Sequence, residues 1–378
     1  MLVLENKATQ VDSLLDKMAE DIQLDKTRYE RMIQSYEAVK KWIEADEAFF
    51  KPYKYEVYPH GSVRIFTSVK PIGKDEFDLD IVLHFVNSLI LHSPLRIYTE
   101  LKRRLSEHET YRKMLEPKSR CLRLNYSGDF HMDIMPGIQE SLLDVNKINV
   151  PDRELGKWVS SNPRGFAEWF MGKANLAKSS LLERAVKVEK IQADDFNKKK
   201  PLQRAVQLIK RYRDIYFEND SRYKTRSIVL TTIAGEFYMG EESIFDTIDQ
   251  IITRIRSKIY YPQRLKIYNP INPEEDFTDK WDTEPKYYEA FIDFVEHLYR
   301  EWQKLKKESG VIEEGKIFKG LFGAELFERA QMQETNLIGS YRKTNDLGII
   351  RDTGIISKSV NSNTEQIKKN TFFGNEDI

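Results

Sequence analysis

Residues 11–43 carry apolar side chains at steps of three and four, which is the spacing of one face of a helix. The repeat runs from Val11 to Ile43 and includes Leu15, Ile22 and Trp42. This pattern predicts one long amphipathic helix, which needs a large surface to lie on. Its aromatic residues are expected in the core rather than at a ligand site.

Beyond Tyr53 the apolar positions alternate, as they do in strands with one buried face. The alternating stretches are YEVYPH (55–60), DLDIVLHF (78–85), CLRLNYS (121–127) and FHMDIMP (130–136). The last two are predicted to form a hairpin across Gly128-Asp129. An amphipathic helix expected from Pro94 to His108 interrupts the strands, so this region is predicted to be α+β or α/β.

After Pro163 the sequence becomes largely helical. The expected helices are 166–191, 203–218, 227–239, 242–258, 284–307 and 317–332. Between them, YNPINPEEDFTDKW (268–281) is expected to be an irregular loop, because Pro270 and Pro273 lack amide donors and favour extended neighbours. From Thr335 onward Ser, Thr, Asn, Lys and Gly dominate, which predicts a flexible tail.

Composition indicates a globular protein without a membrane span. Of 378 residues, 40% are hydrophobic and 32% are charged, as is usual for globular chains. No apolar run reaches the ~18 residues of a membrane helix, and no signal-peptide core begins the chain, so a soluble, cytoplasmic protein is expected. Sixty basic and sixty acidic residues give zero net charge, which argues against a protein that coats nucleic acid. The single cysteine, Cys121, excludes an internal disulfide, suits a reducing cytosol and is expected as a small buried hydrophobe.

Candidate chemistry is concentrated in and just before the second predicted strand. Residues two apart on a strand project to the same face, so Asp78 and Asp80 are predicted to point together. Two adjacent carboxylates repel each other unless a cation lies between them, and Mg²⁺ commonly takes carboxylates together with substrate phosphates. Upstream, Gly61 lets backbone approach a ligand closely, and Ser62 is predicted to begin a helix whose free N–H groups attract phosphate. The combination predicts chemistry on a nucleoside triphosphate.

A third carboxylate strengthens this interpretation. By itself, an Asp-x-Asp pair is more often a solvated strand or turn than a metal site. Asp133, however, lies on the short strand that ends at Pro136-Gly137, and a set of three carboxylates suits two metal ions. We also considered His84, His108 and His131 as metal ligands. Their spacing fits no zinc-binding pattern.

These motifs resemble the polymerase-β-type nucleotidyltransferases. The shared pattern is Gly61-Ser62, then DLD at 78–80, then a strand with a single Asp before proline. Within that superfamily the chain resembles the cGAS/DncV-like nucleotidyltransferases, bacterial relatives of the oligoadenylate synthases that make cyclic oligonucleotide signals. Three later stretches extend the resemblance over residues 10–300, namely VQLIKRYRDIYF (206–217), KTRSIVLTTIAGEFY (224–238) and the 268–281 loop. Many members have Gly-Thr a few residues after Gly-Ser, where this chain has Phe66-Thr67.

The resemblance implies an α+β fold, with a polymerase-β-type sheet lobe, a helical C-terminal lobe and a long N-terminal helix across the back of both. The implied division is 1–50 for the long helix, 51–162 for the catalytic core, 163–334 for the helical lobe and 335–378 for the tail.

The resemblance also implies the chemistry. Two Mg²⁺ ions, with Mn²⁺ as a substitute, would be held by Asp78, Asp80 and Asp133, and Asp133 would help to deprotonate the attacking ribose hydroxyl. Lys210 and Ser227 match the family positions that contact the triphosphate. The nucleotide-binding residues implied are Gly61, Ser62, Lys210 and Ser227. Ribonucleoside triphosphates would be joined into a cyclic di- or trinucleotide with release of pyrophosphate, as a signal in antiphage (CBASS-type) defence.

Partners and alternatives stay open at this level. The expected partners are ribonucleoside triphosphates and regulatory or tail-conjugating proteins, since some members carry a C-terminal aromatic-glycine signature similar to Phe372-Phe373-Gly374. Neither a membrane nor nucleic acid is expected to be required. The alternatives are a nucleotidyltransferase that makes linear oligonucleotides or extends RNA ends, and an inactive nucleotide-binding sensor. The nucleotide contact of the 268–281 loop is left open among Asn269, Asn272, Asp276 and Trp281.

Overall fold

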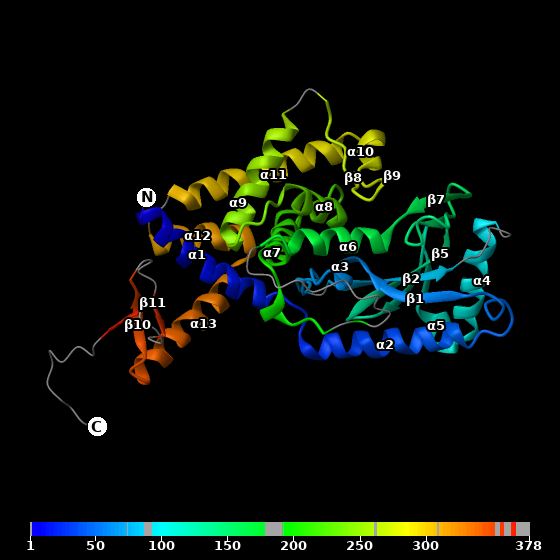
Figure 1. The fold of residues 1–378 in the computed structure, drawn as a ribbon, viewed down its shortest axis with the longest axis horizontal. Coiled ribbons are helices and arrows are strands. Elements are labelled where there is room, and N and C mark those ends of the chain that lie inside the picture. Colours follow the sequence, from blue (N-terminus) through cyan, green and yellow to red (C-terminus); the bar gives the residue numbers. More distant parts are fainter. Residues whose placement is uncertain are drawn as a thin grey trace.

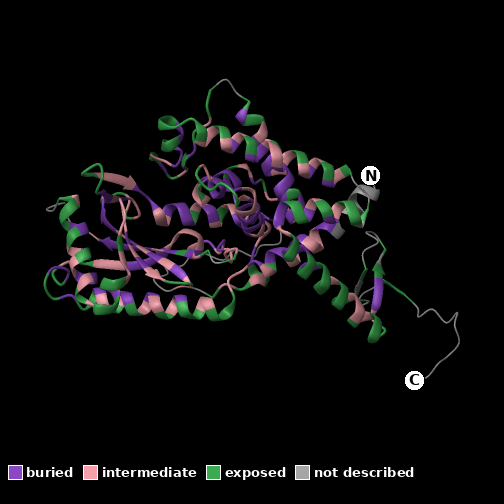
Figure 2. Cartoon of the chain, turned by 180° about the vertical axis from the view of Figure 1, so that it is seen from behind, coloured by how far each residue is buried: buried purple, intermediate pink, exposed green. Residues whose placement is uncertain are grey.

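The computed structural model describes residues 2–73, 75–86, 93–177, 191, 193–260, 263–307, 310–351, 356–358 and 364–367. The chain forms a sheet lobe and a helical lobe side by side (Figure 1). Buried residues gather inside each lobe, and exposed residues line the outside (Figure 2). Among the helices within those ranges, none is both long enough and apolar enough to cross a membrane.

The sheet lobe is built on seven strands. They are β1 (Tyr55–His60), β2 (Phe77–Phe85), β3 (Leu115–Pro117), β4 (Leu122–Tyr126), β5 (Phe130–Gln139), β6 (Ile148–Asp152) and β7 (Lys157–Ser161). Five follow the order β1-β2-β5-β4-β3, and β6 and β7 continue from β5. β2 and β5 run parallel, whereas the other pairs are antiparallel. The four strands predicted from alternation are therefore present, and the predicted hairpin is the β4–β5 pair.

Helices surround the sheet and fill the second lobe. They are α1 (Leu2–Asp21), α2 (Lys26–Glu44), α3 (Gly61–Arg64), α4 (Pro94–Glu107), α5 (Glu109–Met114), α6 (Pro163–Ala174), α7 (Pro201–Tyr216), α8 (Ser227–Phe237), α9 (Ile244–Ile259), α10 (Asp279–Thr283), α11 (Lys286–Lys307), α12 (Val311–Phe322) and α13 (Ala324–Lys343). The helix predicted over residues 94–108 is α4, and those predicted over 203–218, 227–239, 242–258 and 284–307 are α7, α8, α9 and α11.

Alternation along β2 gives the sheet one apolar face and one polar face. Leu79, Ile81 and Leu83 are buried in one cluster with side chains of α2, α4 and α5. Asp78 and Asp80 project to the opposite face, where α3 and α6 lie against the sheet. Because α6 also packs on α7 and α8, the polar face of the sheet is the one that looks toward the helical lobe.

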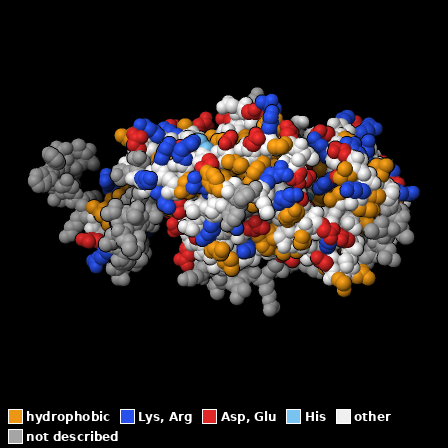
Figure 3. Space-filling view, turned by 90° about the horizontal axis from the view of Figure 1, so that it is seen from above, with side chains coloured by type: hydrophobic (Ala, Val, Ile, Leu, Met, Phe, Trp, Pro, Cys, Tyr) orange, Lys and Arg blue, Asp and Glu red, His pale blue; other side chains and the backbone are white. Residues whose placement is uncertain are grey.

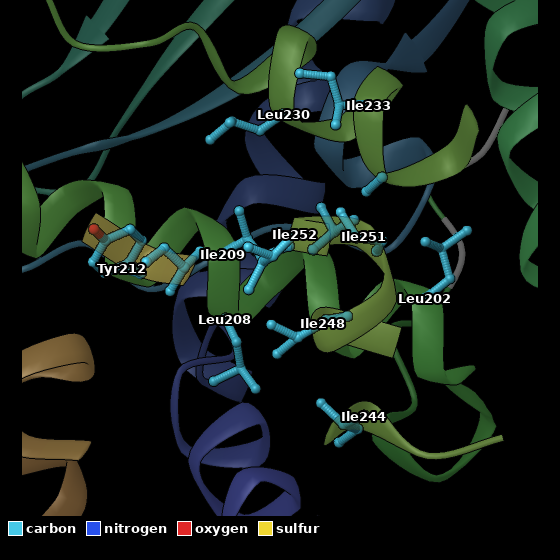
Figure 4. Close-up of a cluster of buried hydrophobic side chains, with 14 of the residues drawn as sticks. Leu202, Leu208, Ile209, Tyr212, Leu230, Ile233, Ile244, Ile248, Ile251 and Ile252 are labelled. Atoms are coloured by element: carbon cyan, nitrogen blue, oxygen red, sulfur yellow. The ribbon is translucent and has the colours of Figure 1, made fainter. Parts of the chain in front are cut away.

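The core of the helical lobe contains aliphatic side chains of α7, α8 and α9. Figure 4 shows Ile209 of α7, Leu230 and Ile233 of α8 and Ile252 of α9 in this cluster. Burying one such side chain contributes about 2 kcal/mol, so the cluster fixes how the three helices pack. It therefore also fixes the residues of α7 and α8 that face the sheet.

The predicted single N-terminal helix is two helices. The carboxylate of Asp25 accepts a hydrogen bond from the backbone N–H of Arg28 at 2.9 Å, and this cap begins α2 as a new helix. Leu15 of α1 is buried in the core of the helical lobe, whereas Met32 of α2 is buried in the core of the sheet lobe. The prediction of one continuous helix over 11–43 is wrong, and the break lets each half follow its own lobe.

The C-terminal segment is more ordered than its composition predicts. The helix expected over 317–332 is two helices, and α13 continues to Lys343 before three short strands. The strands are β10 (Leu347–Ile350), β11 (Ile356–Lys358) and β12 (Thr364–Gln366). Arg329 of α13 binds Asp21 of α1 at 2.8 Å, so the helix is held on the body of the protein. The prediction of a flexible tail from Thr335 is wrong for these elements, whose polar residues lie on exposed faces.

Three further predictions concern connecting segments. The 268–281 stretch, expected to be irregular, contains a short hairpin of β8 (Tyr268–Asn269) and β9 (Asn272–Asp276), followed by α10. Of the helix predicted over 166–191, the structure describes α6, and residues 178–190 lie outside the described part. Phe372-Phe373-Gly374 also lies outside it.

Candidate active site

A row of four side chains crosses the polar face of the sheet. His60 pairs with Asp80 between β1 and β2, Asp80 pairs with Asp133 between β2 and β5, and Asp133 pairs with Arg123 between β5 and β4. Directly paired residues project to the same face of a sheet. Asp78 lies two residues from Asp80 on that face. The structure therefore brings together the three carboxylates predicted from the sequence.

The charges in this row are unbalanced. Removal of the Asp80 carboxylate from water raises its pKa to about 8, and the nearby carboxylates of Asp78 and Asp133 add to the effect. Burial lowers the pKa of His60 to about 4, so this imidazole is neutral near pH 7. Arg123 is therefore the positive member of the row.

Arg123 binds two of the three carboxylates. Its Nε and Nη2 donate to the two oxygens of Asp133 at 2.7 and 2.8 Å, and Nη2 also donates to Oδ1 of Asp78 at 3.2 Å. Our sequence reasoning did not identify this arginine. The alternation of CLRLNYS carried the signal, because Leu122 and Leu124 are both buried and place Arg123 on the polar face.

The residues present fit a divalent cation by their chemistry. Carboxylate oxygens are the ligands that hard divalent ions prefer, and the desolvated Asp80 needs a counter-charge. Within the described residues, however, no group of three or more His, Cys, Asp or Glu side chains is arranged to hold a metal ion. The guanidinium of Arg123 binds oxygens of Asp78 and Asp133 that a metal would use. His131 contacts Glu76 at 2.7 Å and Asp78 at 3.4 Å, but neither it nor His84 or His108 completes such a group among the described residues.

Cys121 lies beside this row and not in the core. It immediately precedes β4 and is half-buried, so the prediction of a buried core residue is wrong. Burial and the neighbouring carboxylate of Asp133 raise the pKa of the thiol far above its ordinary value. The thiol is therefore poorly reactive, because the thiolate is the nucleophilic form.

Gly61 and Ser62 follow β1 directly. Gly61 has a φ of +60°, and a Cβ there would lie 2.1 Å from Oδ2 of Asp80, so both the backbone and the space require glycine. Ser62 does not begin the helix as predicted, since His60 precedes the first turn of α3. The Ser62 hydroxyl lies instead 3.0 Å from that of Ser68, which closes the loop that leads away from α3.

This loop contains the departure from the family pattern. Phe66 has a φ of +58°, in the left-handed region where glycine is favoured. The backbone here therefore has a conformation that favours glycine, although the chain carries phenylalanine. The next residue, Thr67, donates its N–H to the carbonyl oxygen of Ser62 at 2.9 Å, so the strained residue sets the closure of the loop.

We expect Phe66→Gly to be more stable than Phe66→Ala by about 1 kcal/mol, because both lose the side chain but only alanine retains left-handed strain. Denaturant unfolding of the two variants measures this difference. The control is Glu284, an exposed residue with a φ of −140°, where alanine should be at least as stable as glycine. Equal or greater stability of Phe66→Ala would show that the loop is unstrained.

Helix α7 holds this loop through a series of side-chain donors. Gln203 and Gln207 donate to the carbonyl oxygens of Ile65 and Ser68 at 2.9 and 2.7 Å. Lys210 donates to the carbonyl and hydroxyl oxygens of Thr67 at 3.1 and 3.0 Å. Because these donors are buried, each lost bond would leave an unsatisfied group at a substantial cost. The helical lobe thus fixes the loop next to the carboxylates.

Cationic side chains gather across from the carboxylates. Burial, together with the nearby charge of Arg213, lowers the pKa of Lys210 to about 7. Arg213 donates to the hydroxyl of Ser227, the first residue of α8, and to Asp214 at 2.6 Å. Lys224 binds the same carboxylate at 2.8 Å. The predicted Lys210 and Ser227 are thus in one cluster, to which the structure adds Lys224 as a residue that the sequence did not indicate.

A cavity of about 470 Å³ lies between the two sets. Its lining includes Asp78 and Asp80 on the sheet side and Lys210 and Ser227 on the helical side. Asp133 lies beside the cavity, bound to Arg123, and does not line it. A phosphate chain in this space would have carboxylates at one end and ammonium and guanidinium groups at the other.

The β8–β9 hairpin closes a third side of the cavity. Of the four loop residues left open by the sequence, Asn269 lines the cavity and Trp281 is buried in the helical core. Sequence reasoning missed Glu275, which also lines it and accepts hydrogen bonds from Asn269 and Ser161 at 2.8 Å each. Burial raises the pKa of Glu275. The hairpin is thus tied to β7 at the cavity wall.

Comparison with known proteins identifies similar sequences. The family model described as Second Messenger Oligonucleotide or Dinucleotide Synthetase domain matches residues 10–174. A c-di-GMP synthase from Roseivirga ehrenbergii is 42% identical over 377 residues, which cover 99% of this chain and 100% of that protein. The cyclic dinucleotide synthase CdnG from Bradyrhizobium diazoefficiens is 25% identical over 72% of this chain and 71% of its own length.

Solved structures share the fold. The Bradyrhizobium diazoefficiens CD-NTase CdnG in complex with GTP superposes with a TM-score of 0.70 at 22% identity, covering 86% of this chain and 99% of that chain. The 3′-deoxy GTP bound form of Escherichia coli DncV gives a TM-score of 0.57 at 15% identity, covering 86% and 89%. These matches confirm the predicted α+β fold of the polymerase-β type.

Carboxylates on a polymerase-β-type sheet that face a cationic helical lobe across a cavity define a nucleotidyltransferase. This chain belongs to the cGAS/DncV-like nucleotidyltransferases, as its motifs predicted. Members of the family generally use divalent metal ions.

Proposed function

We propose that this nucleotidyltransferase joins two molecules of GTP into a cyclic dinucleotide and releases two molecules of pyrophosphate. The observation that carries the proposal is the cavity in which Asp78 and Asp80 face Lys210 and Ser227. The chain that forms this cavity is 42% identical over 377 residues to a c-di-GMP synthase, which supports guanine nucleotides as the substrate.

Each set of residues has a distinct role in the proposal. Lys210, Arg213 and Lys224 neutralise the triphosphate, and the hydroxyls of Ser62 and Ser227 hydrogen-bond to it. Gly61 leaves room for Asp80 beside the phosphates. Arg and Lys beside phosphate make charge-assisted hydrogen bonds that are stronger than neutral ones.

Asp78, Asp80 and Asp133 are proposed to hold two Mg²⁺ ions, with Mn²⁺ as a substitute. Such ions, when bound, neutralise phosphate charge and lower the pKa of a ribose hydroxyl. Asp133 accepts the proton of that hydroxyl. The hydroxyl oxygen forms a bond to the α-phosphorus of the second nucleotide, while the bond to pyrophosphate breaks. A second transfer of the same kind closes the ring.

Two alternatives receive less support. A transferase acting on RNA ends needs a basic surface to seat a long polyanion, whereas the net charge is zero. Basic and acidic side chains are interspersed on the face seen in Figure 3. An inactive sensor would not need three carboxylates on one face of the sheet, since Arg123 offsets only part of their mutual repulsion.

The biological setting extends the proposal. A cyclic dinucleotide suits a diffusible signal in antiphage defence, and its ribonucleotide precursors are made in the cytoplasm. A solved complex of Escherichia coli CdnC with a HORMA protein has a TM-score of 0.60 to this chain, which supports a regulatory partner protein as a proposal. A tail-conjugating partner acting at Phe372-Phe373-Gly374 stays a prediction, because those residues lie outside the described part.

Nucleotide selectivity tests the substrate assignment. We expect GTP alone with Mg²⁺ to support pyrophosphate release, and ATP, CTP or UTP alone to support at least about tenfold less, a difference of about 1.4 kcal/mol in transition-state binding. A coupled pyrophosphate assay on each nucleotide and each pair measures this. A requirement for ATP beside GTP would contradict a product made of two guanylates.

A further inference from the structure

Arg123 holds the carboxylates in an arrangement that differs from the one a metal requires. Both oxygens of Asp133 accept from its guanidinium, and Oδ1 of Asp78 accepts from the same Nη2 atom. This geometry uses the planar, bidentate character of arginine, which matches a carboxylate better than lysine does. Every oxygen of Asp133 that a metal ion would use is thereby engaged.

The electrostatics of the row explain why a cation is held there. Asp80 has carboxylates on both sides, Asp133 opposite it on β5 and Asp78 on its own strand. His60 at the other end of the row contributes no positive charge when neutral. The other facing groups are His131, which lies 3.4 Å from Asp78, and Lys210 of α7, whose charge also reaches Asp80. Of these groups, Arg123 is the one with hydrogen bonds to two members of the carboxylate set.

We propose that Arg123 is the resident counter-cation of the carboxylate site, and that it competes with the divalent metal for Asp133 and Asp78. The inference rests on the proposed function, because it assumes that these carboxylates are the metal site. Arg123 acts through the carboxylates and is therefore a positioning residue. It keeps the metal-free site assembled and makes metal binding weak until the guanidinium is displaced.

The position of Arg123 suits this exchange. The β4 backbone that carries it is fixed by pairing with β3 and β5, so the side chain can leave without a change of fold. Its side chain is about one-fifth exposed, and Asp78 is open to the cavity. A metal that enters the cavity with a nucleoside triphosphate would therefore meet Asp78 and Asp80, which line it, and phosphate oxygens offer the guanidinium an alternative partner.

Metal binding to Arg123→Gln without nucleotide tests the competition. We expect this variant to bind Mn²⁺ about tenfold more tightly than the wild-type protein or better, because loss of a bidentate charged contact frees both Asp133 oxygens. Electron paramagnetic resonance of Mn²⁺ measures the affinity. In EDTA the variant should melt at a lower temperature than wild type, and Mn²⁺ should raise its melting temperature more. Arg123→Lys, which keeps the charge without the fork, should give an intermediate affinity. Arg120→Gln is the matched control, since Arg120 makes a similar contact with Asp152 at 2.9 Å, and its Mn²⁺ affinity should be that of wild type.

The outcomes separate this inference from the proposed function. Suppose that the wild-type protein binds Mn²⁺, that Asp133→Asn loses this binding, and that Arg123→Gln binds Mn²⁺ no more tightly than wild type. This result would overturn the proposed competition between Arg123 and the metal, and it would leave the metal site in place. If Asp133→Asn and Asp80→Asn both bind Mn²⁺ as tightly as wild type, the carboxylates are not the metal site, and the proposed function fails at this point. If Arg123→Gln fails to fold, Arg123→Lys takes its place. Equal Mn²⁺ affinities of Arg123→Lys and wild type would then show that Arg123 does not compete with the metal.

Discussion

The Asp78→Ala, Asp80→Ala double variant should make no detectable product and yet be at least as stable as wild type in metal-free buffer. Product is lost because two of the three carboxylates that line or adjoin the cavity are gone. Stability is kept because the variant removes two repelling carboxylates from one strand face. Pyrophosphate release and thermal unfolding in EDTA measure the two effects. Asp220→Ala is the control, since Asp220 pairs with Arg222 on the surface and its loss should not alter activity.

The stability of the metal-free protein should depend on pH through Asp80. Its pKa is about 8 in the folded protein against an ordinary value of 3.8, so the folded state binds a proton that the unfolded state releases. Stability therefore falls as pH rises from about 4 to about 8. Asp80→Asn should be more stable than wild type at pH 8, with little difference at pH 4. A greater loss of stability at pH 8 in Asp80→Asn would mean that the carboxylate is already paired in the folded state.

Gly61→Ala should reduce synthesis by about a hundredfold or more. The added Cβ would lie 2.1 Å from Oδ2 of Asp80, so the carboxylate or the loop must move by about 1 Å, which in other active sites costs rates of that order. Steady-state kinetics measure the loss. The left-handed φ of +60° adds about 1 kcal/mol of destabilisation.

Gly156→Ala is the matched control for this variant. Gly156 has a φ of +62°, but a Cβ there meets no atom within 4 Å. It should lose about the same stability as Gly61→Ala and keep full activity. Equal activity of both variants would show that Asp80 tolerates displacement and would remove Gly61 from the site.

Alternation predicted the parts of the site that lie on strands. The period of two placed Asp78 and Asp80 on one face, and the predicted β4–β5 hairpin placed Asp133 on a strand of its own. The parallel pairing of β2 with β5, which puts Asp80 opposite Asp133, could not be derived from either segment, because it depends on which strands meet in the sheet. The roles of all three carboxylates stay a proposal.

The parts that were missed depend on contacts between distant segments. Lys224 reaches the Asp214 carboxylate of α7 from the segment before α8, and Arg123 matters only because β4 lies beside β5. The break before α2 was encoded locally, in the Asp25 cap, but the continuous apolar period outweighed it. The order of the C-terminal segment likewise comes from the packing of α13 on α1 and not from its composition. The domain boundaries expected at 50, 162 and 334 stay predictions.

The central claim is most directly tested by the product that wild-type protein makes from labelled GTP and Mg²⁺. After phosphatase treatment, mass spectrometry should detect a resistant product with the mass of two guanylates joined without terminal phosphate. Asp133→Asn, which keeps the size but removes the charge, should make about a hundred- to a thousandfold less of it. Only phosphatase-sensitive linear products from the wild-type protein, or no product from any nucleotide, would contradict the account.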